Sequence, residues 1–144
     1  MEYRKLNLID GPDQDLHDFM RLLNTALEAG HTKVNMELLA PLTAAGITQA
    51  FVAVAPDGAV VGLQMWDIGQ QWNFDVSFCI MRVNFFESGH DTPVNKAQFM
   101  QQGTTQLRVE HGSATFVAAQ THTPEYDYLL NCGLTPLVTI HVIP

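Results

Sequence analysis

The chain has 144 residues, of which 47% are hydrophobic and 15% are charged, and its formal net charge is −8. This length and composition predict one globular domain, residues 1–144, and exclude a disordered chain. Seven Lys and Arg residues against fifteen Asp and Glu residues supply no basic face, which excludes a nucleic acid as partner. No signal peptide and no apolar run of about 18 residues is apparent, so we expect no membrane association and a cytoplasmic location.

The first elements are a strand over residues 2–9 and a helix over residues 13–30, which Gly30 ends. The apolar residues of this helix recur at helical spacing, which predicts that they share one core-facing side. They are Leu16, Phe19, Met20, Leu23 and Leu27. We expect His17 and His31 to be solvated, because neither has a partner at metal-ligand spacing.

A second helix follows, with Asn35 as its N-cap and Gly46 at its end. Pro41 lies inside this segment and predicts a kink or two short pieces, because proline removes a helical hydrogen bond.

Two runs of strand-forming residues, 51–54 and 60–66, flank the dipeptide Asp57-Gly58. Asp-Gly between two such runs is a strong signal for a β-hairpin, because Gly adopts positive φ without steric penalty. Gly62 inside the second run predicts a β-bulge or a close backbone neighbour.

Residues 74–86 predict a long strand, with Asp75, Ser77, Cys79 and Met81 on one face. Asp75, Ser77 and Glu87 are the candidate polar groups of this segment; the alternative is a half-exposed sheet face without chemistry. We expect Cys79 and Cys132 to be buried free thiols, because both lie in apolar runs.

The remaining elements are a helix from about residue 96 to 111, a strand over 115–119, a helix from 124 and a strand over 137–143. For the last helix, Thr123 suits the N-cap, Pro124 the first helical position and Gly133 the end.

The order strand, helix, helix and then the hairpin PDGAVVG resembles the GNAT family of N-acetyltransferases. This resemblance implies an α/β fold of GNAT-like type, with a mixed, mostly antiparallel sheet of six to seven strands flanked by about four helices. It also implies that the two N-terminal helices line the groove for an acceptor substrate.

The resemblance further implies that acetyl-CoA binds between the strands at 74–86 and 115–119. The backbone of Cys79, Ile80 and Met81 would contact its pantetheine arm. The loop with Ser88, Gly89 and His90 would hold its diphosphate. This loop departs from the family pattern, because it has one glycine and no arginine. It also contains Asp91, whose negative charge opposes a diphosphate.

The tail THTPEYDYLLNCGL is the second point of resemblance. The family's catalytic tyrosine, which protonates the departing thiolate, corresponds to Leu129, and Tyr128 stands one residue earlier. The same tail is similar to small GNAT-like proteins of tailed phages with eroded cofactor loops. That similarity implies a virion assembly or a homo-oligomer as partner, in the host cytoplasm or in the virion.

Three functional hypotheses follow. The first is an N-acyltransferase that moves an acetyl group from acetyl-CoA to an amine, with Asp75, Glu87 or Ser77 (through water) as base and Tyr128 as acid. The second is a catalytically silent GNAT fold that serves as an interaction or virion-associated protein. The third is a small-molecule binding module that uses the same cleft for another ligand.

Overall fold

The computed structural model describes residues 1–30, 35–70, 77–111, 116–118 and 124–131. A five-stranded sheet in the order β1-β2-β3-β4-β5 forms its centre. Strands β1 to β4 are antiparallel neighbours, and β5 runs parallel to β4. The strands are β1 (Glu2–Lys5), β2 (Thr48–Val54), β3 (Val60–Gln70), β4 (Ser77–Phe86) and β5 (Phe116–Ala118). The helices are α1 (Asp13–Glu28), α2 (Met36–Ala44), α3 (Pro93–His111) and α4 (Pro124–Asn131).

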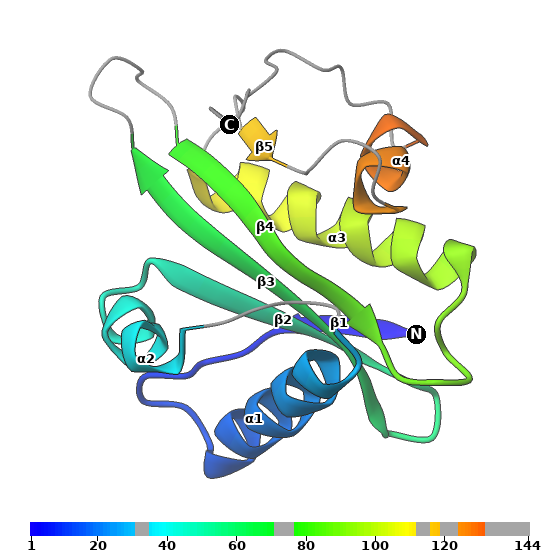
Figure 1. Ribbon diagram of the computed structural model, residues 1–144, viewed down its shortest axis with the longest axis horizontal. Coiled ribbons are helices and arrows are strands. Elements are labelled where there is room, and N and C mark those ends of the chain that lie inside the picture. The colour runs from blue at the N-terminus through cyan, green and yellow to red at the C-terminus, as the bar shows by residue number, and fades with distance from the viewer. Residues whose placement is uncertain (31–34, 71–76, 112–115, 119–123, 132–144) are drawn as a thin grey trace.

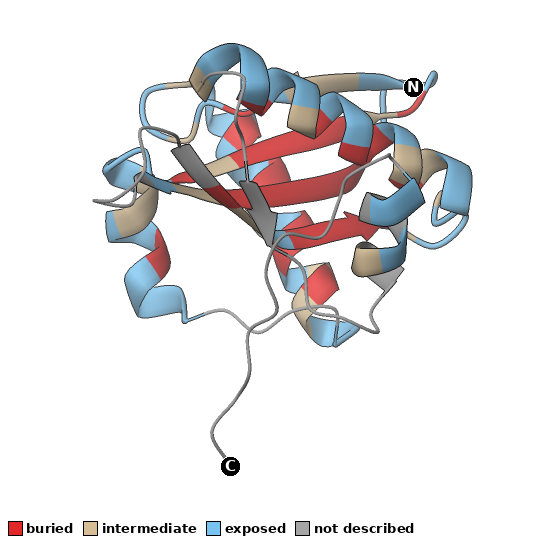
Figure 2. Ribbon diagram, turned by 90° about the horizontal axis from the view of Figure 1, so that it is seen from above, coloured by how far each residue is buried: buried red, intermediate tan, exposed pale blue. Residues whose placement is uncertain are grey.

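Helices cover both faces of the sheet, as an α/β fold requires (Figure 1). Helices α1 and α2 pack on one face through a core that includes Phe19 and Leu39, and α3 packs on the other through Phe99. Figure 2 shows the buried strands between these layers. The predicted strand over 137–143 lies outside the described residues.

The predicted core stripe of α1 is wrong at Leu16, whose exposed fraction is 48%. The buried side consists instead of Phe19, Leu22, Leu23 and Ala26 together with Asp15 and Asp18. Asp15 turns inward because Arg4 Nη1 and the backbone N–H of Asn7 both donate hydrogen bonds to its carboxylate, at 2.8 and 3.1 Å. His17, by contrast, is exposed as predicted.

The hairpin between β2 and β3 is confirmed. Gly58 has a φ of 88°, and Asp57 Oδ1 accepts the N–H of Ala59 at 2.9 Å. The bulge predicted at Gly62 is confirmed, because the register between β2 and β3 shifts beside it. The close neighbour is a side chain and not the predicted backbone: a Cβ at Gly62 would lie 2.7 Å from the ring of Phe86.

Helix α2 is capped as predicted, since Asn35 Oδ1 accepts the N–H of Glu37 at 3.1 Å. Pro41 lies inside this single nine-residue helix, which is not divided into two pieces. Helix α3 begins at Pro93, three residues before the predicted start near 96. Proline is favoured in the first helical turn, because its missing N–H has no helical partner there.

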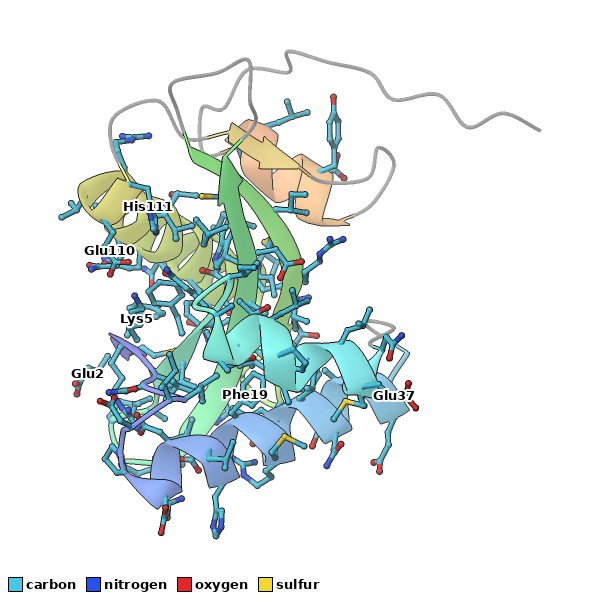
Figure 3. The ribbon with its side chains drawn as sticks, turned by 90° about the vertical axis from the view of Figure 1, so that its left-hand side faces the viewer. Glu2, Lys5, Phe19, Glu37, Glu110 and His111 are labelled. Atoms are coloured by element: carbon cyan, nitrogen blue, oxygen red, sulfur yellow. The ribbon has the colours of Figure 1, made fainter. Side chains whose placement is uncertain are left out.

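Helix α3 is fixed to the sheet at its middle and at its end. In the middle, Gly103 lies against the buried side chain of Gln64, which donates to the carbonyl of Phe99 at 3.2 Å. At the end, Lys5 Nζ of β1 pairs with Glu110 Oε2 at 2.9 Å, on the flank that Figure 3 shows. The described helices include none long and apolar enough to cross a membrane.

Candidate functional site

A β-bulge interrupts the pairing of β3 with β4. Met65 pairs with Val83 and the next residue, Trp66, pairs with Met81, so Arg82 is the extra residue of β4. A bulge of this kind bends its strand and redirects a side chain. The redirected side chain is that of Arg82, which reaches the face of the sheet on which α1 and α2 pack.

Arg82 belongs to a polar group that spans three neighbouring strands. Its Nε donates to Asp67 Oδ2 at 2.6 Å, and Thr48 Oγ1 donates to Asp67 Oδ1 at 3.0 Å. Thr48 is buried, whereas the side chains of Asp67 and Arg82 are 22% and 53% exposed. The carboxylate of Asp67 is therefore held in a fixed orientation and still reaches solvent.

A second polar group lies where β4 leads into α3. The N–H of His90 donates to the carbonyl of Glu87, and the N–H of Thr92 donates to the carbonyl of His90. Thr92 then caps α3, because its Oγ1 accepts the N–H of Asn95 at 3.1 Å. Gly89 has a φ of 90°, which permits this tight turn.

A carboxylate of the chain itself, that of Asp91, lies at the N-terminus of α3. Asp91 Oδ1 lies 2.8 Å from Lys96 Nζ, and the side chain of Lys96 is 9% exposed. A carboxylate beside a helix N-terminus is favoured by the helix dipole. Asp91 and Thr92 therefore already supply the negative charge and the hydrogen-bond acceptor that this helix end favours.

Glu87, a predicted base, forms an ion pair with Arg21 of α1. Arg21 also donates from Nη2 to the carbonyl of Val60 at 2.6 Å. Glu87 therefore ties α1 to the hairpin end of the sheet. It lies about 16 Å along β4 from Arg82, at roughly 3.3 Å per residue.

The predicted coenzyme residues fall into two separate places. Cys79 and Ile80 pair with Val117 and Ala118 of β5, which confirms that the two strands are neighbours; the structure shows that they run parallel. Met81 follows directly, at the bulge. Ser88, Gly89 and His90 lie in the turn at the other end of β4.

The thiol of Cys79 is buried and free, as predicted. Burial raises its pKa to about 11, so at neutral pH it is a protonated core side chain and not a nucleophile.

Three predicted catalytic groups remain as predictions. Asp75 lies outside the described residues. Ser77 begins β4 and Tyr128 lies within α4, and the structure describes only the backbone of both. The slot predicted between β4 and β5 also stays a prediction, because the chain that follows Ala118 is outside the described part.

The sequence prediction missed Thr48, Asp67 and Arg82. One signal was available: Asp67 continues the alternation of Leu63 and Met65, which face the core. A carboxylate at a core-facing position of a strand needs a partner or a function.

No protein-family model and no curated protein matches this sequence. Solved structures do match it, among them a probable acetyltransferase with a TM-score of 0.73 and 10% identity, over 100% of this chain and 97% of the other. An aminoglycoside acetyltransferase from an uncultured soil metagenomic sample, in complex with sisomicin, matches with a TM-score of 0.71 and 12% identity, over 99% and 94%. The ribosomal-protein-alanine N-acetyltransferase of Brucella melitensis biovar Abortus 2308 matches with a TM-score of 0.70 and 16% identity, over 100% and 99%. The chain thus has the α/β GNAT-like fold over its full length, and at these identities the likeness concerns the fold.

Proposed function

We propose that this chain is a binding domain on an acetyltransferase fold, catalytically silent because it does not hold a coenzyme diphosphate at α3. The ion pair between Asp91 and Lys96 carries this proposal. As partner we propose another protein, with a second copy of this chain or the virion components of a tailed phage as the candidates that the sequence resemblance names.

A diphosphate does not fit the residues at the start of α3. Helix N-termini bind phosphate through free backbone N–H groups and the positive end of the dipole. Here Pro93 has no N–H, and the N–H groups of Thr92 and Asn95 are bonded within the turn. A diphosphate would also have to approach the carboxylate of Asp91, and like charges a few ångströms apart repel strongly.

The test is thermal unfolding with and without millimolar acetyl-CoA. We expect no rise in the Tm of the wild-type protein. A coenzyme present at about 100 times its Kd stabilises a fold by about 2.7 kcal/mol, which for a chain of this size is a rise of roughly 5–10 °C. Such a rise in the wild-type protein would contradict the proposal.

Two variants make the test specific to Asp91. In Asp91→Gly and Asp91→Asn the carboxylate is removed, so we expect inorganic pyrophosphate or acetyl-CoA to raise the Tm. Glu2→Gln serves as the control, because Glu2 is exposed and its replacement also removes one negative charge. This variant should behave as the wild type. If no variant responds, the charge of Asp91 is not what keeps the diphosphate away.

N-acyl transfer is the second candidate, favoured by the fold shared with acetyltransferases and by the parallel neighbours β4 and β5. In this reading acetyl-CoA supplies the activated acetyl group when bound. Tyr128 would protonate the departing thiolate, and Asp75 or Glu87 would take a proton from the acceptor amine. A wild-type Tm rise with acetyl-CoA, with acetylation of an amine, would establish this candidate in place of the first.

A further inference from the structure

We infer that the chain binds an extended peptide segment of a partner protein in a hollow beside the start of β2, where the segment pairs with the backbone of Thr48. The hollow has a volume of about 370 Å³. It lies at the β1 margin of the sheet, beside Lys5, which Figure 3 labels. The inference rests on the binding role proposed above and names the place on this chain where the partner docks.

The hollow borders a strand edge that the chain leaves unpaired. Strand β1 ends at Lys5, and beyond it the N–H of Leu6 still donates to the carbonyl of Ala50 at 2.9 Å. Bonding positions alternate along an antiparallel strand, so Thr48, two residues before Ala50, turns its N–H and C=O toward the same side. Within the described residues nothing pairs with the backbone of Thr48 there. One residue of β2 is therefore an open edge.

Thr43, near the end of α2, lines the same hollow with an unsatisfied hydroxyl. Threonines inside helices can donate to the carbonyl four residues earlier. Thr25 does so to Arg21 and Thr104 to Met100, both at 2.9 Å. The Oγ1 of Thr43 is buried and has no partner in the described part of the chain. A group bound in the hollow would supply the missing hydrogen bond, whose absence costs stability.

Gln49 supplies a second unsatisfied atom among the residues that line the hollow. Its Nε2 lies 3.3 Å from His111 Nε2, whereas its Oε1 is buried without a partner among the described residues. Buried polar atoms in folded proteins nearly always have a hydrogen-bond partner. Two such atoms on one hollow indicate that a molecule other than the chain completes it.

The rest of the lining favours a neutral ligand with an apolar side chain. Part of the wall is apolar and consists of Leu6, Leu8, Ile9 and Ala50. The described lining includes no carboxylate, and its cation, Lys5, is paired with Glu110. The hollow therefore attracts neither an amine nor an anion by charge.

An extended peptide has the groups that this lining lacks. One of its residues carries both the N–H and the C=O that the backbone of Thr48 can pair with. Its neighbouring amides offer donors and acceptors to Thr43 and Gln49. Main-chain pairing at a strand edge, with hollows for alternate side chains, is a recurring mode of peptide recognition.

The probe for this inference is N-acetyl-leucine methylamide, titrated into the full chain while its backbone amide signals are followed by NMR. This probe has no free amine, so it cannot act as the acceptor of an acetyl group. We expect saturable shifts at Thr43, Thr48 and Gln49. N-acetyl-proline methylamide lacks the N–H that would donate to Thr48 and should bind roughly fivefold more weakly or worse.

Thr43→Val separates binding from folding, because valine has nearly the shape and helix propensity of threonine without the hydroxyl. We expect this variant to bind the leucine probe about fivefold more weakly, the effect of one neutral hydrogen bond. Its Tm should be unchanged or higher, since the hydroxyl has no partner to lose. Thr25→Val is the matched control: its hydroxyl is bonded within α1, so the Tm should fall while the affinity changes by less than about twofold.

Equal binding of the leucine and proline probes would show that no strand pairing occurs and would overturn the inference. Absence of saturable shifts at millimolar probe would overturn it as well, and a lower Tm of Thr43→Val would then show that the hollow holds only water. The result is separable from the coenzyme test. A Tm rise with acetyl-CoA refutes the silent-domain proposal, whereas absent peptide binding refutes only the site at Thr48.

Discussion

Gly103→Ala tests the close packing of α3 against the sheet. A Cβ at this position would lie 1.8 Å from Gln64 Oε1 and 2.9 Å from Gln64 Cδ. Gln64 has no exposed surface, and its Oε1 accepts the indole N–H of Trp66 at 2.8 Å. The added methyl group therefore forces Gln64 away and breaks a buried hydrogen bond.

The expected loss is worked out from three contributions. In an ordinary helix, Gly to Ala gains about 1 kcal/mol. Here overpacking costs about 1–3 kcal/mol, and the buried N–H of Trp66 left without its acceptor costs about 1–3 kcal/mol more. The net loss is about 1–5 kcal/mol, or a fall in Tm of roughly 3–15 °C.

The assay is chemical or thermal unfolding followed by circular dichroism. Thr105→Ala is the matched control, since Thr105 is exposed in the same helix and its replacement should raise stability by a few tenths of a kcal/mol. If Gly103→Ala is at least as stable as the wild type, Gln64 does not lie against this helix. The packing of α3 described above would then be wrong.

Three further changes have defined outcomes. Gly62→Ala places a Cβ 2.7 Å from the buried ring of Phe86 and should lower the free energy of unfolding by about 1–3 kcal/mol, measured by denaturant titration. Burial alone would raise the pKa of Asp15, but its hydrogen bonds, with Arg4 first among them, lower the pKa below its ordinary value. Asp15→Asn should therefore destabilise the fold at neutral pH by about 1–3 kcal/mol, and the difference from wild type should shrink as the pH falls below about 4; a gap that stays constant down to pH 2 would contradict this. Burial raises the pKa of Cys79 to about 11, so its thiol should not react with iodoacetamide at pH 8 in the folded protein. Peptide-resolved mass spectrometry should detect alkylation of Cys79 only after the protein is unfolded.

Features that depend on a few neighbouring residues were readable from the sequence. The hairpin follows from Asp57-Gly58, because only the conformation of those residues is needed to reverse the chain. The cap of α2 at Asn35 follows from one side chain and the N–H two residues later. That β4 and β5 are neighbours was predicted from the family resemblance together with the two apolar runs, whereas their parallel direction was not predicted.

Features that depend on pairing between distant segments were not readable. The stripe prediction on α1 failed at Leu16 because Arg4, from β1, stabilises Asp15 in the buried position. The bulge at Arg82 arises from the register of β4 against β3, and a change of register by one residue moves side chains to the other face. Alternation with Leu63 and Met65 indicates that Asp67 faces the core, but its partners Thr48 and Arg82 come from the two neighbouring strands and could not be read from the sequence.

The polar groups at the two ends of β4 differ in how far hydrogen bonds and ion pairs within the chain satisfy them. At the start of α3, the carboxylate of Asp91 pairs with Lys96, and Thr92 Oγ1 accepts the N–H of Asn95. An added anion would therefore approach a negative charge that is already in place. At the bulge, Asp67 has two donors for about four acceptor positions and lies partly open to solvent. The chain as a whole is acidic, which disfavours anions at both places. Under the proposal made above, the anion at the start of α3 is the carboxylate of Asp91 itself, so removing its charge should make this helix end more favourable for an added anion.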